Sequence, residues 1–317
     1  MTNILITGAT GAVGRYVTQA LLAEGHTLRL LVRSSQPSPQ LTTQFGDLSR
    51  PETLHNVCDG IDVVIHLAAK LHINDPSADL HAEYHQTNVI GTQCLVEDAL
   101  RHKVQRFVFA STINVYGSSD GRVPFTEASP LNPDSIYAET KISAENAVRT
   151  QIPHTILRLA AVYGRQMNGN YPRLVQAIGK RRFAYIGDGN NRRALIHERD
   201  VAAAISHVMA TPAARDQTFN LTDNQPHRLR DIVEAIATAQ AVAPPSIHLP
   251  AKPLRLALGM IEDTVSALGK RSPLTRAIVD KMTEDMAVDS RQIQTMTGFV
   301  PEVTLQDGWA DACCVRL

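Results

Sequence analysis

Residues 3–14 read NILITGATGAVG, an apolar run that leads directly into glycines at Gly8, Gly11 and Gly14. The pattern predicts a buried strand, a tight turn and then a helix. Gly8 permits the turn, Gly11 lets backbone N–H groups approach a pyrophosphate, and Gly14 lets the helix pack closely on the sheet. This stretch therefore predicts a dinucleotide-binding turn. The alternative is a glycine-rich turn that binds no ligand.

Short apolar runs alternate with helical periodicity as far as about residue 222. The strand candidates are NILIT, LRLLV, DVVIHLA, RFVFAS, HTILRLA and TFNLT. This alternation predicts an α/β fold, a Rossmann-type doubly wound parallel sheet with a smaller, mostly helical C-terminal substrate lobe. We expect the dinucleotide-binding domain to span residues 1–164, completed by a segment near 196–222. The substrate-binding lobe would then hold residues 165–195 and 223–317.

Composition excludes several classes of protein. The 317 residues contain 31 Lys or Arg and 31 Asp or Glu, with no basic stripe interleaved with aromatic residues, so nucleic acid is not expected as a partner. No apolar run is long enough for a membrane span and no leader segment precedes the first strand, which predicts a cytoplasmic protein. The four cysteines and twelve histidines show no disulfide or metal-binding spacing, so no metal is expected.

The C-terminal third holds one strongly patterned segment. Six apolar residues fall on one face of a predicted helix near 254–268, namely Leu254, Ala257, Leu258, Ile261, Val265 and Leu268. We expect this face to pack within the C-terminal lobe. A helix that lies on a membrane surface or contacts a partner is the alternative, because Lys270 and Arg271 follow directly.

Candidate catalytic residues lie in the run IYAETKISAE. Tyr137 and Lys141 are four residues apart in a segment that favours a helix, so both side chains would emerge on one face. A nearby ammonium group favours the phenolate and lowers the pKa of a tyrosine, which can then exchange a proton with an alcohol or a carbonyl group. Thr112, at the end of a predicted strand, offers a hydroxyl to the same substrate oxygen. The alternative for the Tyr/Lys pair is an exposed helix face.

Six motifs in order along the chain extend this pattern. They are TGATGAVG at 7–14, GDL at 46–48, HLAA at 66–69, TNVIGT at 87–92, ASTINVYG at 110–117 and YAETK at 137–141. Together they resemble the extended short-chain dehydrogenase/reductase family, and within it the NAD-dependent epimerase/dehydratase group. Later stretches, RALIHERDVAAAI among them, are similar to further landmarks of that family, so the resemblance runs through essentially the whole chain.

The resemblance implies a catalytic set of Thr112, Tyr137 and Lys141. It implies cofactor contacts from Gly8, Gly11, Ala12, Val13, Gly14, Asp47, Leu48, Leu67, Ala68, Ala69, Asn88, Tyr137 and Lys141. In the family, Asp47 would lie on the adenine side and Asn88 would brace the central helix and strand. A turn cap and a simple helix hydrogen bond are the alternatives for these two residues. Arg193 and Thr112 would contact substrate, although the run NNRR is also typical of a solvated loop. Family members form dimers through two long helices, which predicts a homodimer.

Three departures from the family pattern bear on specificity. Arg33 follows the second strand where an NAD site usually has a carboxylate, and an arginine suits a 2′-phosphate, so the NAD(P) cofactor is expected to be NADP. Arg33 as an exposed loop residue is the alternative. Ala161 stands where many sugar-nucleotide enzymes have Asn, which removes a polar substrate contact. The run HERD at 197–200 replaces a more acidic stretch, and the sequence explains neither Glu198 nor Arg199.

The resulting hypothesis is an NAD(P)-dependent epimerase or reductase that acts on a nucleotide-activated sugar by hydride transfer. Dehydration is disfavoured because Ile113 and Asn114 follow Thr112, where dehydratases carry an acidic pair. One alternative is an oxidoreductase similar to 3-beta-hydroxysteroid dehydrogenase or dihydroflavonol 4-reductase, acting on an apolar alcohol or ketone. A further alternative is a non-catalytic NAD(P)-sensing protein, although such proteins commonly lose the tyrosine or the lysine.

Overall fold

The computed structural model describes residues 1–34, 41–71, 78–118, 123–167, 169–268, 272 and 275–314. Lys270 and Arg271 lie outside the described residues. At the centre is a seven-stranded sheet in which every neighbouring pair of strands is parallel. In spatial order the strands are β11 (Gln217–Leu221), β6 (His154–Leu159), β5 (Arg106–Thr112), β4 (Val63–His66), β1 (Asn3–Thr7), β2 (Thr27–Val32) and β3 (Thr42–Phe45). The predicted doubly wound sheet is confirmed.

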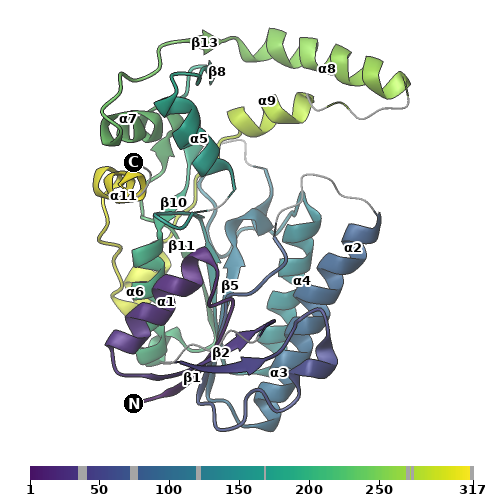
Figure 1. The fold of residues 1–317 in the computed structure, drawn as a ribbon, viewed down its shortest axis with the longest axis vertical. Coiled ribbons are helices and arrows are strands. Elements are labelled where there is room, and N and C mark those ends of the chain that lie inside the picture. The colour runs from purple at the N-terminus through teal and green to yellow at the C-terminus, as the bar shows by residue number, and fades with distance from the viewer. Residues whose placement is uncertain are drawn as a thin grey trace.

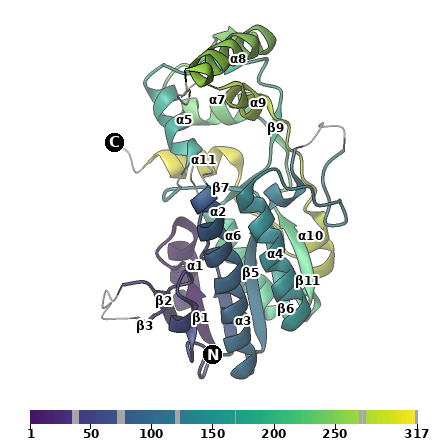
Figure 2. The same ribbon diagram turned by 90° about the vertical axis from the view of Figure 1, so that its right-hand side faces the viewer.

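Helices cover both faces of the sheet. On one face α1 (Ala12–Ala23) packs against α6 (Glu198–Ala210), and on the other α3 (Gly91–Arg101) packs against α4 (Ile136–Gln151). The helix α2 (Ala78–Tyr84) continues into α3 through a π-helical segment, His85–Ile90. Figure 2 shows α2, α3 and α4 on the near face, with α1 and α6 behind them. Both layers bury apolar strand residues such as Ile6 and Phe107, which are 0% exposed.

The sequence pattern missed the edge strand β3. Its residues, TTQF, carry a single large apolar side chain, and that residue, Phe45, is exposed. The strand forms because β2 offers an unpaired backbone edge, with Val32 in register with Phe45. Strand β4 is shorter than the predicted run, because the chain leaves the sheet after His66.

The smaller lobe lies beyond the carboxyl ends of the strands (Figure 1). Its helices are α5 (Asn170–Gly179), α7 (Leu229–Ala239), α8 (Ala251–Ala267), α9 (Arg276–Thr283) and α11 (Leu305–Cys313). Among the described residues, three short strand pairs belong to it: β7 (Ala161–Tyr163) with β10 (Leu195–His197), β9 (Arg192–Arg193) with β12 (His227–Arg228), and β8 (Tyr185–Ile186) with β13 (His248–Leu249). Trp309, which is 0% exposed and stacks on Tyr163, lies in its core.

Two parts of the C-terminal third differ from expectation. The segment from Met286 to Phe299, which includes α10 (Arg291–Thr297), packs into the apolar core of the sheet domain beside β11 rather than in the lobe. The predicted amphipathic helix forms as α8, but Gly259 is its one buried residue among those described. Its apolar face packs on α9 and leaves Ile261 and Leu268 exposed, so lobe packing covers it only in part.

Candidate active site

A cleft of about 2160 Å³ runs along the carboxyl ends of the strands and into the lobe. That volume exceeds the range of a typical single-ligand pocket by about twofold. The cleft begins at the turn after β1 and ends against α5 and α9. The arrangement follows the general rule for open α/β sheets, in which ligands bind outside the carboxyl ends of the strands.

The glycine turn leaves no room for side chains. A Cβ atom on Gly14 would lie 2.1 Å from the Gly8 carbonyl oxygen, and one on Gly8 would lie 2.7 Å from the Ala68 nitrogen. Gly8 also has a φ of +73°, a conformation that favours glycine. Gly11, Ala12 and Val13 line the cleft at the start of α1. The unpaired N–H groups of that first turn form an anion-binding end, so these residues fit a dinucleotide pyrophosphate.

Arg33, Asp47 and Leu48 line the end of the cleft beside β2 and β3. Arg33 is exposed, whereas Leu48 is buried. The Asp47 carboxylate accepts hydrogen bonds from the Ser49 backbone nitrogen at 2.9 Å and from the Ser49 hydroxyl at 2.8 Å. Asp47 therefore caps the turn at Ser49 and also lines the cleft. An adenosine half of a dinucleotide would meet both a cation and an anion at this end.

A directed chain of hydrogen bonds supports the strand end that carries Leu67, Ala68 and Ala69, all of which line the cleft. The Ala68 backbone nitrogen donates to the Thr7 hydroxyl at 3.1 Å, and that hydroxyl lies 2.6 Å from His66 Nδ1. His66 Nε2 lies 3.0 Å from the Thr92 hydroxyl, which donates to the Asn88 carbonyl oxygen at 2.7 Å.

In this series of hydrogen bonds, each donor faces an acceptor only if His66 is neutral and carries its proton on Nε2. Burial, with the Lys141 charge adding to it, lowers the pKa of His66 to about 3, which agrees with that state. The sequence predicts no role for His66 beyond its place in the HLAA motif. Its position between two threonines depends on pairing between β1, β4 and α3, which no local pattern reveals.

Asn88 braces the site without lining it. Its Oδ1 accepts from the Lys70 backbone nitrogen at 2.7 Å, while its Nδ2 donates to the Lys70 carbonyl oxygen and to the Thr140 hydroxyl, both at 3.1 Å. The side chain thereby ties the loop after β4 to α4, the helix that carries Tyr137. Asn88 is buried and is not among the described residues that line the cleft.

Thr112 and Tyr137 meet the cleft from two neighbouring elements. Tyr137 lies in the first turn of α4, which begins after Ser135, whose hydroxyl accepts from the Ala138 nitrogen at 3.3 Å. The Thr112 hydroxyl accepts from the Asn114 nitrogen at 3.2 Å, so its own proton can be donated elsewhere. The neighbouring Ser111 donates to the buried carboxylate of Glu145. The Thr112 hydroxyl can therefore donate its proton to a ligand, whereas the Ser111 hydroxyl already donates to Glu145.

Lys141 shares the helix face of Tyr137 but lies deeper. It is 2% exposed, its Nζ lies 3.8 Å from the centre of the Phe109 ring, and it is not among the described residues that line the cleft. Burial lowers the pKa of Lys141 to about 7, although the Glu145 carboxylate opposes that shift. Burial also raises the pKa of Tyr137, with Tyr84 adding to the effect. The pKa of Tyr137 is therefore raised, whereas the sequence predicted that Lys141 would lower it.

The lobe half of the cleft is lined mainly by apolar side chains with a few cations. The apolar residues include Met167, Leu174, Phe183, Met282 and Met286. Arg193 lies in β9, where its guanidinium donates to the Lys281 carbonyl oxygen at 2.6 Å and pairs with Glu284 at 3.4 Å. Arg193 is thus held by α9 rather than free in a loop. Ala161 also lines this half, without a polar group.

Glu198 has a clear structural role. It is 0% exposed, and its Oε1 accepts from the backbone nitrogens of Arg165 at 2.6 Å and Gln166 at 3.4 Å. The carboxylate therefore holds the loop that follows β7 against the start of α6. Burial raises the pKa of Glu198, although the two backbone hydrogen bonds oppose that shift.

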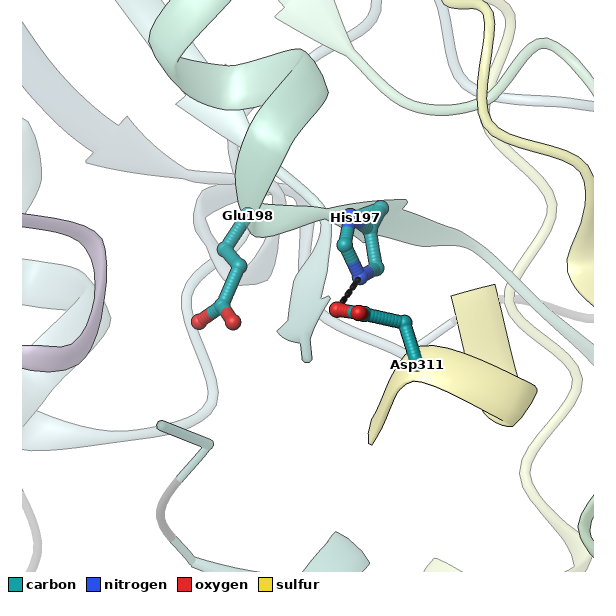
Figure 3. A group of neighbouring side chains, drawn as sticks. All are labelled: His197, Glu198 and Asp311. Carbon is teal, nitrogen blue, oxygen red and sulfur yellow. Dashed lines mark ion pairs between the residues drawn. The ribbon is translucent and has the colours of Figure 1, made fainter. Parts of the chain in front are cut away.

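His197, which is buried, and Asp311, which is partly exposed, complete a small cluster with Glu198 (Figure 3). His197 Nε2 lies 3.6 Å from Asp311 Oδ2, and Asp311 also pairs with Arg165 at 2.6 Å. His197 Nδ1 accepts from the Arg199 nitrogen at 3.3 Å, which leaves the proton on Nε2. That tautomer directs an N–H group, and not a lone pair, at the Asp311 carboxylate. The chemistry therefore suits a bridging water better than a metal ion.

The fold and the glycine turn define a dinucleotide-binding enzyme of the short-chain dehydrogenase/reductase type. Residues 4–222 match the model of the NAD dependent epimerase/dehydratase family, and the chain belongs to that family. It is 27% identical over 314 residues to N-acetyl-alpha-D-glucosaminyl-diphospho-ditrans,octacis-undecaprenol 4-epimerase of Escherichia coli O157:H7, which covers 96% of this chain and 92% of that protein.

The chain is also similar to a ketoreductase and to a solved structure with a nucleotide sugar bound. The chain is 26% identical to 4-hydroxy-2-methyl-3-oxo-4-farnesyl-3,4-dihydroquinoline-1-oxide ketoreductase of Stigmatella aurantiaca, with 96% and 93% of the two chains covered. The solved structure of MoeE5 in complex with UDP-glucuronic acid and NAD matches with a TM-score of 0.74, 26% identity and coverage of 98% and 97%. Among the described residues, each helix is too short or too polar to cross a bilayer.

Proposed function

We propose that this enzyme transfers a hydride between an NADP cofactor and a nucleotide-activated sugar, with epimerisation or net reduction as the outcome. The observation that carries the proposal is the single cleft that joins the glycine turn and Tyr137 to a lobe with cations at its far end. The MoeE5 relative, with UDP-glucuronic acid and NAD bound, supports the pairing of a dinucleotide with a nucleotide sugar.

The bound nicotinamide would supply the hydride chemistry, and the chain would supply orientation and proton transfer. Tyr137 exchanges a proton with the reacting hydroxyl or carbonyl oxygen. Thr112 donates its free hydroxyl proton to the same oxygen, because its oxygen already accepts from Asn114. Lys141, one helix turn after Tyr137, supplies positive charge in its protonated form. Arg193 and Lys281, which line the cleft and share Glu284 as an ion-pair partner, offer charge to the substrate diphosphate.

Arg33 supports the choice of NADP, since a guanidinium pairs well with a 2′-phosphate. Asp47 lies at the same end of the cleft, and its carboxylate would repel that phosphate if it came close. The cofactor preference therefore depends on which of the two side chains meets the ribose.

The first experiment is thermal stabilisation of the purified protein by NADP+, NAD+, UDP and a UDP-hexose, alone and in pairs. A ligand that binds only the folded state raises the melting temperature. Stabilisation by a dinucleotide and by UDP or the UDP-hexose is expected. Stabilisation by a dinucleotide alone would contradict the sugar-nucleotide proposal and would leave the fold assignment intact.

A second candidate is a reductase for a ketone with a long apolar chain. The apolar lining of the lobe half, with Ala161 in place of a polar residue, favours it, as does the similarity to the farnesyl dihydroquinoline-oxide ketoreductase. Consumption of NADPH with a medium-chain 3-oxo ester, without consumption with UDP-sugars, would select this candidate.

We also propose a homodimer formed through α3 and α4. Leu100, near the end of α3, is 41% exposed and would be covered in such a dimer. Light scattering should give twice the chain mass at micromolar protein, and Leu100→Glu should reduce that mass to one chain. A single-chain mass for the unaltered protein would exclude the dimer.

A further inference from the structure

The lobe end of the cleft contains one carboxylate among its cations. Of the described lobe residues that line the cleft, the charged ones are Arg173, Arg193, Lys281 and Glu284. The three cations fit an anionic group of the substrate. Glu284 would repel that group, so an anion alone is not the ligand to which this end of the cleft is complementary.

The Glu284 carboxylate uses one of its two oxygens within the protein. Oε2 lies 2.8 Å from Lys281 Nζ and 3.4 Å from Arg193 Nη1. In the part of the chain that the structure describes, no residue donates a hydrogen bond to Oε1. A carboxylate oxygen accepts hydrogen bonds and does not donate them. Since Glu284 lines the cleft, Oε1 is an acceptor that is available to a ligand there.

The backbone around Glu284 is fixed against β9. Asn191 Nδ2, directly before this strand, donates to the carbonyl oxygens of Met282 at 3.1 Å and Glu284 at 3.0 Å. The backbone nitrogen of Arg192 donates to Asp285 Oδ1 at 2.8 Å. The position of the free acceptor is therefore set before a ligand binds, which reduces the conformational entropy that binding would cost.

A phosphate group with a sugar hydroxyl beside it complements this arrangement. Arg193 and Lys281 favour the phosphate, and the carboxylate that both of them contact favours a hydroxyl donor. A ketone with a long apolar chain offers no such donor, so Oε1 of Glu284 would lose its hydrogen bonds to water without replacement. This end of the cleft therefore favours the nucleotide sugar over the apolar ketone.

We propose that Glu284 is a substrate-binding residue whose Oε1 accepts a hydrogen bond from a sugar hydroxyl next to the diphosphate. The inference rests on the proposed function, because it takes the ligand of the lobe half to be a nucleotide-activated sugar. Such a substrate carries hydroxyls on its hexose and on its ribose, and both offer the same donor chemistry.

Three ligands separate the phosphate contact from the hydroxyl contact. Inorganic pyrophosphate has no sugar, UDP adds the ribose, and UDP-glucose adds the hexose as well. Their dissociation constants are measured by calorimetric titration of the full-length protein, saturated with NADP+ or NAD+, whichever stabilises it more. Saturation fills the glycine turn, so pyrophosphate and UDP cannot bind there instead.

Glu284→Gln should affect these ligands in opposite directions. Loss of a negative charge should leave the binding of pyrophosphate equal or tighter. The amide keeps its oxygen towards Arg193 and Lys281 and turns its NH2 group to the ligand, which removes the acceptor. Binding of UDP-glucose should therefore weaken about fivefold or more relative to pyrophosphate. Glu284→Ala, which removes the whole group, should give the same sign.

Asp285→Asn is the matched control. Asp285 is the next acidic residue and pairs with Arg192 at 3.0 Å, but it is not among the described residues that line the cleft. The variant loses the same charge and keeps an acceptor for the Arg192 backbone nitrogen. It should leave the ratio of the UDP-glucose and pyrophosphate dissociation constants unchanged.

The pattern of losses identifies the hydroxyl. Weaker binding of UDP-glucose alone supports the proposal with the hexose as the donor, and weaker binding of both UDP and UDP-glucose supports it with the ribose. Equal effects of the Glu284 variants on all three ligands would overturn the proposal, because a general loss of structure affects them alike. An unaltered protein that dinucleotide stabilises but that binds none of the three would contradict the sugar-nucleotide function itself, and this proposal with it.

Discussion

The Nζ atom of Lys141 lies 3.8 Å from the centre of the Phe109 ring, in a site that leaves the lysine 2% exposed. A cation above an aromatic face gains attraction, but desolvation of the ammonium costs more here, because the pKa of Lys141 is lowered to about 7. Burial of the Lys141 ammonium group therefore lowers the stability of the fold.

Lys141→Met should raise the melting temperature at pH 7 by several degrees and greatly reduce turnover. The gain should shrink as pH rises from about 7 to 10. In that window the unfolded chain still binds the lysine proton and the folded chain does not, so the unaltered protein becomes more stable with rising pH. Calorimetry of both proteins across this range is the measurement. A lower melting temperature for the variant at pH 7 would show that the ammonium is stabilising.

Tyr137→Phe should reduce turnover by about 10² to 10⁴-fold, the usual contribution of a positioned acid or base. The affinity for dinucleotide should remain close to that of the unaltered enzyme, since the ring is kept. Steady-state kinetics and a dinucleotide titration together check this. Nearly intact turnover would show that Tyr137 is not catalytic. The proposed role of Thr112 would then have to be tested separately.

Gly14→Ala should abolish dinucleotide binding or prevent folding, because the new Cβ would lie 2.1 Å from the Gly8 carbonyl oxygen. Gly259→Ala is the control. It lies in α8, where the nearest atom to a new Cβ is an Arg276 side-chain atom at 3.4 Å, and alanine favours a helix by about 1 kcal/mol over glycine. The control should keep dinucleotide binding and melt at an equal or higher temperature.

Arg33→Ala should weaken binding of NADP+ by about tenfold or more, since a charge-assisted contact contributes about 1.5 to 3 kcal/mol. Binding of NAD+ should change little, which makes NAD+ the internal control. Dissociation constants for both dinucleotides, measured by fluorescence titration, provide the comparison. An equal loss for the two cofactors would mean that Arg33 stacks on adenine and does not read the 2′ position.

Two substitutions separate the roles of the Glu198 carboxylate. Glu198→Ala should lower the melting temperature, because the Arg165 and Gln166 nitrogens lose their acceptor. Glu198→Gln keeps an acceptor and removes a buried charge, so it should melt at or above the unaltered protein at pH 8.

The advantage of Glu198→Gln should diminish as pH falls towards about 4.5. Burial raises the pKa of Glu198, so the folded chain takes up this proton before the unfolded chain does, and acid favours the unaltered fold in that window. Melting curves at several pH values test the sign. An advantage that grows in acid would contradict the raised pKa.

The amino-acid sequence determined those features that depend on local spacing. The alternation of apolar runs and helices predicts the parallel sheet, and the glycine spacing predicts the tight turn before α1. An interval of four residues places Tyr137 and Lys141 on one helix face, since helix geometry decides it without reference to distant residues. Arg33 and Thr112 are predicted from their positions at strand ends, so the principal candidate residues of the site could be predicted from the sequence.

Only the tertiary structure decided which distant residues meet. Lys141 rests on Phe109 because β5 passes beneath α4, and His66 bridges Thr7 and Thr92 because three separate elements converge. Glu198 and Asp311 become neighbours because α11 of the lobe passes close to the start of α6. The apolar face of α8 is covered only in part, because α8 packs on α9 at the outer end of the lobe. Side-chain periodicity specifies which face of an element is apolar, but the path of the chain in space decides what covers that face.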